Sequence, residues 1–291
     1  MTAAALPSDA LAPLTREALA ARIDALPALP TVASGLLRGF DDPDVDTAQL
    51  ARQLAADQSL AARALRVANS PFYGLPGRVE SIREAIMVLG LRAVRSLVFS
   101  AAVVRTLSAT QTAAPFDALS FWRHGVATAV AARHLAQHAG CSADTAFTAG
   151  LLHDVGKLVL AVTCPQHYAA ALAWQQQANC LTNEAEQQVM GLTHADAGAL
   201  LAERWGLPAA IGAAVAHHHH PGEAARQPLA AVVCAANVLA HGLGLADGGD
   251  ESVPPLDDAV CAALKLDWAR LGGALSRIET EFEDTLNALI D

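Results

Sequence analysis

Apolar residues recur at intervals of three and four along most of this chain, and no segment alternates apolar and polar residues as a half-buried strand would. In the stretch QSLAARALRVAN, for example, this spacing places Leu60, Ala64, Val67 and Ala68 on one face of a helix. Alanine and leucine, which lose little entropy on entering a helix, are abundant, whereas aromatic residues make up only 4% of the chain. The sequence therefore predicts an all-α fold.

Capping residues, prolines and glycines indicate where the helices begin and end. Thr15 is expected to cap the first helix, which the prolines of LPALP end, and Asp46 is expected to cap a later one. The predicted helices cover about residues 16–25, 31–40, 47–57, 58–69, 80–89, 91–108, 118–139, 143–154, 157–162, 165–179, 183–190, 194–204, 208–218 and 228–241, and two more follow before the C-terminus.

The segment SATQTAAPFD, at residues 108–117, is polar, rich in small residues and contains a proline. Such composition is typical of a connection between domains, and 291 residues is long for a single compact core. We therefore expect two helical subdomains, the first covering residues 15–110 and the second covering residues 116–291.

The formal net charge of −10 opposes nucleic-acid binding, which usually requires a basic surface. The helices around TAQLARQLAADQSLAARALRVAN could be read as a DNA-binding helix-turn-helix, but packing of two amphipathic helices fits the acidic chain better. The loop NSPFYGLPGR carries Phe72 and Tyr73, which could form a contact surface or pack against the second subdomain. We favour packing, because large apolar side chains are usually buried.

The N-terminus MTAAALPSDALAPL has no basic region of the kind that precedes a secretory signal. Arginines interrupt apolar stretches such as MVLGLRAVRSLVFSAAVV, which leaves no continuous apolar run of about 20 residues to cross a membrane. The five cysteines are widely spaced and contain no CxxC pair, as expected for reduced thiols. These features predict a cytoplasmic protein without a membrane partner.

All eleven histidines follow the predicted boundary, so any metal chemistry is expected in the second subdomain. Imidazole and carboxylate groups suit zinc, manganese or iron, and separate helices can direct them into one interior site. His134, His138, His167 and His241 are most simply surface or capping residues, and we assign them no role. The remaining order is more specific, because a helical histidine is followed by GLLHDVGK, then LTHADAG and then HHHHP.

These motifs resemble those of an HDOD domain from about residue 25 to residue 245. LPALPTVASGLLRGF through SIREAIMVLGLRAVRSLVFSAAV resembles its first part, and FWRHGVATAVAARHLA, AFTAGLLHDVGKLVL, LTHADAGALLAERWGLPAAI and HHHHP resemble its second part. The resemblance implies an all-helical fold similar to the HD superfamily of metal-dependent phosphohydrolases. It also implies a role in bacterial signalling and regulation.

Carried over to this sequence, the HD pattern implies His124, His153 and Asp154 as metal ligands. The later aspartate ligand of catalytic members corresponds to Asn237, and Lys157 corresponds to a lysine that contacts phosphate in some of them. The additional ligands of two-metal members correspond to His194 and to His218 or His219. The implied cofactor is a weakly held divalent ion, zinc, manganese, iron or magnesium.

The sequence departs from the catalytic pattern in two ways: the first favours a regulatory module with little or no catalysis, and the second argues against cyclic-di-GMP as a substrate. Asn237 replaces a carboxylate by a neutral amide, and the histidine run is not followed by the Gly-Tyr-Pro signature of the HD-GYP enzymes. We expect this module to bind a signalling protein or a nucleotide-like small molecule. The alternative is a metal-dependent phosphohydrolase acting on a nucleotide or another phosphoester, in which Lys157 would contact phosphate.

Overall fold

The computed structural model describes residues 11–29, 31–38, 57–70, 73–75, 77–108, 112, 115–245 and 253–290. The helices of the first half are α1 (Arg16–Ile23), α2 (Thr31–Arg38), α4 (Gln58–Ala68), α5 (Ile82–Leu89) and α6 (Leu91–Ser108). Those of the second half are α7 (Ala118–Leu135), a short 3₁₀ turn (Ala136–Ala139), α8 (Ala143–Leu152), α9 (Val155–Thr163), α10 (Pro165–Ala178), α11 (Thr182–Met190), α12 (His194–Trp205), α13 (Ala209–His217), α14 (Pro221–Ala224), α15 (Pro228–Gly242), α16 (Asp258–Leu264) and α17 (Trp268–Ile290). No strand occurs within these described ranges, so the predicted all-α fold is confirmed.

Local sequence determines most helix starts. The side chain of Thr15 accepts a hydrogen bond from the backbone of α1, and Asp57 and Ser81 do the same for α4 and α5. The predicted helix that Asp46 would cap lies outside the described residues. The short helix α14 was not predicted, and its proline at the first position begins a single turn that periodicity cannot reveal.

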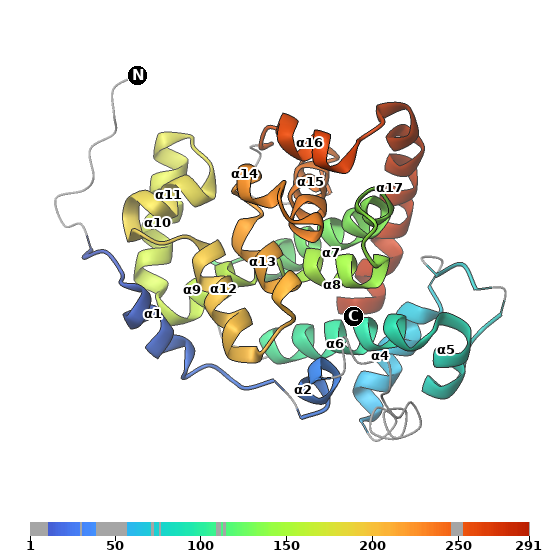
Figure 1. Cartoon of the computed structure of the whole chain (residues 1–291). Coiled ribbons are helices and arrows are strands. Elements are labelled where there is room, and N and C mark those ends of the chain that lie inside the picture. The colour runs from blue at the N-terminus through green and yellow to red at the C-terminus, as the bar shows by residue number, and fades with distance from the viewer. Residues whose placement is uncertain are drawn as a thin grey trace.

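Helix α6 joins the two halves of the molecule. Every residue from 93 to 104 is buried, because α6 packs against α4 and α5 on one side and against α8 on the other (Figure 1). The hydroxyl of Ser96 donates to the backbone oxygen of Asp144 at 2.7 Å, which ties α6 to the start of α8. Buried residues from both halves form one continuous hydrophobic core. The division at residues 110–116 stays a prediction.

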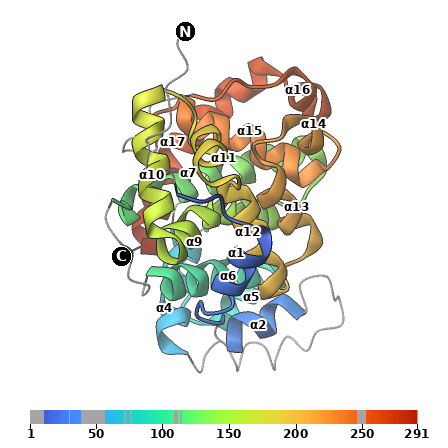
Figure 2. The same cartoon turned by 90° about the vertical axis from the view of Figure 1, so that its left-hand side faces the viewer.

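The first and last described helices each pack against both halves or against the opposite half of the molecule. Helix α1 lies against α9 and α12, as Figure 2 shows, and Arg22 donates a hydrogen bond to the backbone oxygen of Thr163 at 3.1 Å. Helix α17 packs on α7 and reaches α4, where Arg63 donates to the backbone oxygen of Leu289 at 2.9 Å. The helices that carry the histidines are therefore braced from both termini.

Tyr73 packs against the second half, as predicted. The guanidinium group of Arg133 on α7 lies 4.5 Å from the centre of the Tyr73 ring and 2.8 Å from the Asp144 carboxylate. Burial raises the pKa of the Tyr73 hydroxyl, although the charge of Arg133 opposes this change. Phe72 lies outside the described residues.

The stretch Ala143–Thr163, which includes α8 and α9, is long and apolar enough by composition to cross a membrane. Within the fold, 83% of an apolar 18-residue window of this stretch is buried, as expected for the core of a globular chain. All five cysteines are free thiols, as the sequence predicted.

Candidate metal centre

Two close helix contacts create the geometry of the site. Gly150 lies against α7, where an added Cβ would be only 2.8 Å from the backbone of Ala129. Gly156 lies against the start of α12, where an added Cβ would clash with the backbone oxygen of His194. Because only glycine permits these approaches, the GLLHDVGK sequence brings α7 and α12 to opposite sides of the junction between α8 and α9.

The first ligand group consists of His124 on α7 and His153 at the end of α8. Asp154 follows His153 directly and precedes α9. The Nε2 atoms of the two histidines are 3.2 Å apart, and each is 3.5 Å from Oδ2 of Asp154. All three residues are buried, so the predicted juxtaposition of His124 with the His-Asp pair is present in the structure.

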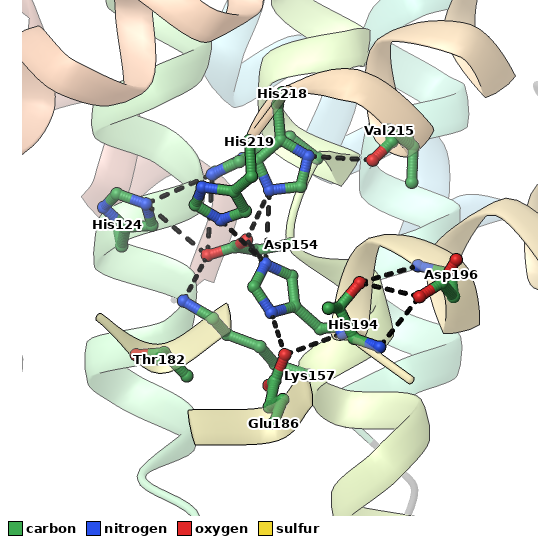
Figure 3. A network of polar contacts seen from close by, with 12 residues as sticks. His124, Asp154, Lys157, Thr182, Glu186, His194, Asp196, Val215, His218 and His219 are labelled. Atoms are coloured by element: carbon green, nitrogen blue, oxygen red, sulfur yellow. Dashed lines mark hydrogen bonds and ion pairs between the residues drawn. The ribbon is translucent and has the colours of Figure 1, made fainter. Parts of the chain in front are cut away.

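The second ligand group consists of His194, His218 and His219. His194 begins α12, and the other two follow α13. Oδ1 of Asp154 is 3.1 Å from Nε2 of His194 and 3.2 Å from Nε2 of His218, and Nε2 of His219 is 3.0 Å from Nε2 of His194. Figure 3 shows the Asp154 carboxylate between the two groups, which together with Asp154 form the His-Asp cluster.

In His153 and His218, a hydrogen bond at the far side of the ring fixes which nitrogen faces the cluster. Nδ1 of His153 donates to the backbone oxygen of Gly150 at 2.7 Å, and Nδ1 of His218 donates to that of Val215 at 2.8 Å. Because a carbonyl oxygen only accepts, these rings carry their proton on Nδ1 and, when neutral, present a bare Nε2 lone pair to the cluster.

The chemistry of this donor set fits divalent metal ions. Lone pairs from His153 and His218 converge with the Asp154 carboxylate, whose Oδ1 is the atom nearest to His194 and His218. Such a concentration of acceptors suits a divalent cation, and the ligand atoms of each group lie within 4.8 Å of one another. His124, His153 and Asp154 would hold one ion, and Asp154, His194, His218 and His219 would hold another.

Glu186 on α11 is a site residue that the sequence did not reveal. Its fully buried carboxylate accepts hydrogen bonds from Nδ1 of His194 at 2.6 Å and from the backbone nitrogen of His194 at 2.7 Å. Burial alone would lower the pKa of His194, but Glu186 and Asp154 raise it to about 9. Glu186 belongs to no motif, and only the fold of α11 onto α12 brings it to the cluster.

Lys157 adds a positive charge beside Asp154. Its Nζ lies 2.7 Å from Oδ2 of Asp154, three residues earlier in the chain. Burial opposes the charge of both groups, but their attraction prevails, so the pKa of Lys157 is raised and that of Asp154 is held well below its usual range. Lys157 is therefore placed to contact an anion at the cluster, as the resemblance implied.

Asn237 is buried on α15, and its side-chain oxygen has no hydrogen-bond partner among the described residues. One turn later, the ring of His241 lies 4.5 Å from that of His124, so α15 passes beside the first group. His241, to which the sequence assigned no role, is thus a neighbour of the cluster. Direct ligation by Asn237 stays a prediction.

A cavity of about 500 Å³ opens beside the first group and is lined in part by His124, Asp154, Lys157 and His241. A larger hollow of about 1100 Å³ lies between α4 and α17 and is lined by none of the histidines. We take the smaller cavity as the functional one, because it is lined by the candidate metal ligands His124 and Asp154.

Known proteins share this architecture. A protein of Shewanella amazonensis SB2B, provisionally named a phosphohydrolase, is 27% identical and superposes with a TM-score of 0.76 over 93% of this chain and 97% of its own. An HDOD domain protein of Geobacter sulfurreducens is 24% identical, with a TM-score of 0.78 over 93% of this chain and 98% of its own. A protein of Marinobacter aquaeolei VT8, provisionally assigned to signal transduction, is also 24% identical, with a TM-score of 0.75 over 97% of this chain and 63% of its own.

Sequence comparison gives the same family. An uncharacterized protein of Treponema pallidum (strain Nichols) is 29% identical over 224 residues, which are 76% of this chain but only 43% of that protein. The chain thus spans less than half the length of this relative. The sequence profile of the HDOD domain matches residues 26–221, which include both ligand groups and Asp154. The chain therefore belongs to the HDOD domain family.

Proposed function

We propose that this chain is a regulatory module that binds a small phosphate-bearing ligand at a divalent-metal centre and transmits its occupancy to a signalling partner. The observation that carries the proposal is the position of Asp154 between the two ligand groups, with Lys157 beside it and a cavity adjacent. Metal ions held at such a centre supply Lewis acidity and attraction for phosphate oxygens.

The charge of the cluster favours an anionic ligand. Among the described residues, Asp154 is the only carboxylate in either ligand group, and both groups share it. The charges of Asp154 and of Glu186 behind His194 balance only part of the charge of two divalent ions, and Lys157 adds a further positive charge. The excess would attract a phosphate strongly because the site is largely shielded from water.

Asn237 supports a binding role over efficient catalysis. If it faces the first group, a neutral amide oxygen stands where catalytic relatives of the HD superfamily are expected to have a carboxylate. The first ion would then be held less tightly, and its position beside a reacting phosphate would be less fixed. A receptor tolerates such a loss better than an enzyme.

Hydrolysis of a phosphoester is the second candidate function. It is supported by the arrangement itself, since two ligand groups joined by one carboxylate are typical of two-metal phosphohydrolases. The 27% identity to the Shewanella protein, provisionally named a phosphohydrolase, is a second argument for it. In either case Lys157 would contact the phosphate and Glu186 would hold His194 in place.

Two measurements on untagged protein test the proposal. Elemental analysis and calorimetric titration with Mn²⁺ should show divalent metal binding, and the manganese-loaded chain should then bind inorganic phosphate, whereas the metal-free chain should not. Failure of the loaded chain to bind phosphate would contradict the proposal. Turnover of an aryl phosphate or a cyclic nucleotide at about 1 per second or faster, lost in Asp154→Ala, would establish hydrolysis instead.

A further inference from the structure

The cavity beside the first group extends well past the metal ligands. Besides His124, Asp154 and Lys157, it is lined by the segment before α7, the first turn of α7 and one face of α10. Its volume of about 500 Å³ falls within the range of about 300–1,000 Å³ that is usual for small-molecule sites. It can therefore hold the organic part of a ligand whose phosphate lies at the cluster.

One wall of the cavity is aromatic. Phe116 is half-buried, and its ring centre lies 5.3 Å from that of Phe121 and 6.1 Å from that of Tyr168. Leu172 on α10 extends the same apolar lining. Flat rings of this kind offer a surface against which a planar group can stack.

Amide side chains line the cavity together with these rings. Gln175 and Gln176 project from the last turns of α10, and the Gln175 amide nitrogen donates to the hydroxyl of Thr182 at 3.0 Å. An amide offers both donors and acceptors, which match the edge of a heterocyclic base better than a purely hydrocarbon ring. The lining therefore favours a nitrogen heterocycle as the planar group.

Charge limits the number of phosphates in the ligand. Lys157 is the only lysine or arginine among the described residues that line the cavity, and it already lies at the cluster. Away from the cluster the lining includes the carboxylate of Asp117, whose pKa is held below its usual range by hydrogen bonds from Ser120. A second phosphate there would meet a negative charge and no matching cation.

We propose that the cavity selects a nucleoside monophosphate. The phosphate lies at the His-Asp cluster beside Lys157, and the base stacks against Phe116 with its edge towards Gln175 and Gln176. This inference rests on the proposed function, because the metal centre is what holds the phosphate.

Calorimetric titration of the manganese-loaded chain with four probes tests the inference. Inorganic phosphate, ribose 5-phosphate, AMP and ADP add the phosphate, the sugar, the base and a second phosphate in turn. We expect AMP to bind about tenfold more tightly than ribose 5-phosphate, because stacking of a base on an aromatic side chain contributes that much. ADP should bind no more tightly than AMP. If the chain hydrolyses the esters, kcat/KM replaces affinity in the same comparison.

Two variants locate the base. Phe116→Leu keeps an apolar side chain but removes the ring, and it should lower affinity for AMP about tenfold while leaving affinity for inorganic phosphate unchanged. The matched control is Leu119→Ala, three residues later in the first turn of α7, because Leu119 is 58% exposed and does not line the cavity. The control should bind both probes as the unaltered chain does, and thermal melts should show that both variants are folded.

Each outcome separates the inference from the proposed function. Equal affinity for AMP and ribose 5-phosphate, or an unchanged affinity of Phe116→Leu for AMP, would overturn the base site while leaving phosphate binding intact. Tenfold tighter binding of ADP than of AMP would overturn the limit to one phosphate. If the loaded chain binds neither phosphate nor any of its esters, the inference and the proposed function both fail.

Discussion

The two ligand groups on either side of Asp154 differ in number of ligands, support and access. The first group has two histidines, borders the cavity, and includes His124, whose Nδ1 has no hydrogen-bond partner among the described residues. The second group has three histidines, none of which lines the cavity, and Glu186 supports His194 from behind. One cluster thus contains an open group with few constraints and an enclosed group with strong ones.

This difference suggests a division of roles. Partners that fix the orientation and charge of a ligand raise metal affinity, so the second group should hold the more permanent ion. The first group borders the cavity, so an ion there is the one that can contact a ligand and also the one more easily lost. Four predictions test this contrast, ordered from the largest expected effect to the smallest.

Removal of Asp154 should weaken metal binding at both ligand groups and so remove the difference in affinity between them. Because both groups share this carboxylate, Asp154→Ala should lower the affinity of both metal steps by more than about a hundredfold, which exceeds the usual effect of losing an outer-shell partner. Calorimetric titration with Mn²⁺ measures both steps, and the step that disappears in His124→Ala identifies the first group. Asp154→Asn tests the charge alone with little change of shape.

A surface substitution provides the control for these Asp154 variants. Asp258 is exposed in the first turn of α16, so Asp258→Ala removes the same charge without touching the cluster. Retention of either metal step in both Asp154 variants would show that Asp154 is not the shared ligand.

Neutralising Glu186 should lower metal affinity at the second group and leave the first group largely unaffected. Glu186→Gln keeps the shape but weakens the acceptor for Nδ1 of His194, so affinity at the second group should fall by about 10- to 100-fold while the first group changes little. Titration of the variant with Mn²⁺ checks both steps. Glu203→Gln is the matched control, because Glu203 is an exposed residue of α12, the helix that His194 begins. Equal losses in both steps would contradict separate roles.

The sequence predicted which histidines and which aspartate lie together better than it predicted the residues that support them. His124, His153, Asp154 and His194 were identified through the family resemblance, because they lie in the motifs FWRHGVATAV, GLLHDVGK and LTHADAG. Glu186 and His241 were missed, because their contacts with His194 and His124 depend on how α11 and α15 pack in three dimensions. Periodicity shows which face of a helix is apolar, but it does not show which polar side chain on that helix meets a distant partner.

Helix boundaries show the same limit. The range 91–108 was predicted as observed for α6, because continuous apolar spacing and the preceding Gly90 define it locally. By contrast, the helix predicted to run to residue 154 ends at Leu152, and α9 already begins at Val155. The break occurs where His153 and Asp154 turn towards the cluster, and helix propensity alone does not report this requirement.

The two groups should also respond differently to pH. In the metal-free protein the pKa of His194 is raised to about 9, whereas burial lowers that of His153 to about 3 and that of His124 well below its usual value. A ring must lose its Nε2 proton to bind a metal, so at pH 7 an ion at the second group must displace one proton from His194. Its affinity should therefore rise about tenfold per pH unit between pH 7 and 9.

The first group should show no such slope over the same range, because its rings are already neutral at pH 7. Metal titrations at pH 7 and pH 8, in two buffers that differ in ionisation enthalpy, would count the released protons for each step. One proton is expected for the second group and none for the first. The same pH dependence for both steps would contradict the assigned charge of His194.

Replacing Asn237 by a carboxylate should reduce the difference in metal affinity between the two groups. If this side chain faces the first group, Asn237→Asp adds a negative ligand with nearly unchanged shape, and the first metal step should gain about three- to tenfold in affinity, or up to ~1.4 kcal/mol. In the metal-free variant, the new carboxylate would repel Asp154, so thermal stability at neutral pH should fall and metal should restore more of it than in the unaltered chain. Asn287→Asp, on the exposed surface of α17, makes the same charge change far from the cluster and should alter neither quantity. If Asn237→Asp behaves like this control in both the titration and the melts, then the amide does not face the metal. The weaker metal binding expected of the first group would then come from its smaller number of histidines, the lack of a supporting carboxylate and its access to the cavity.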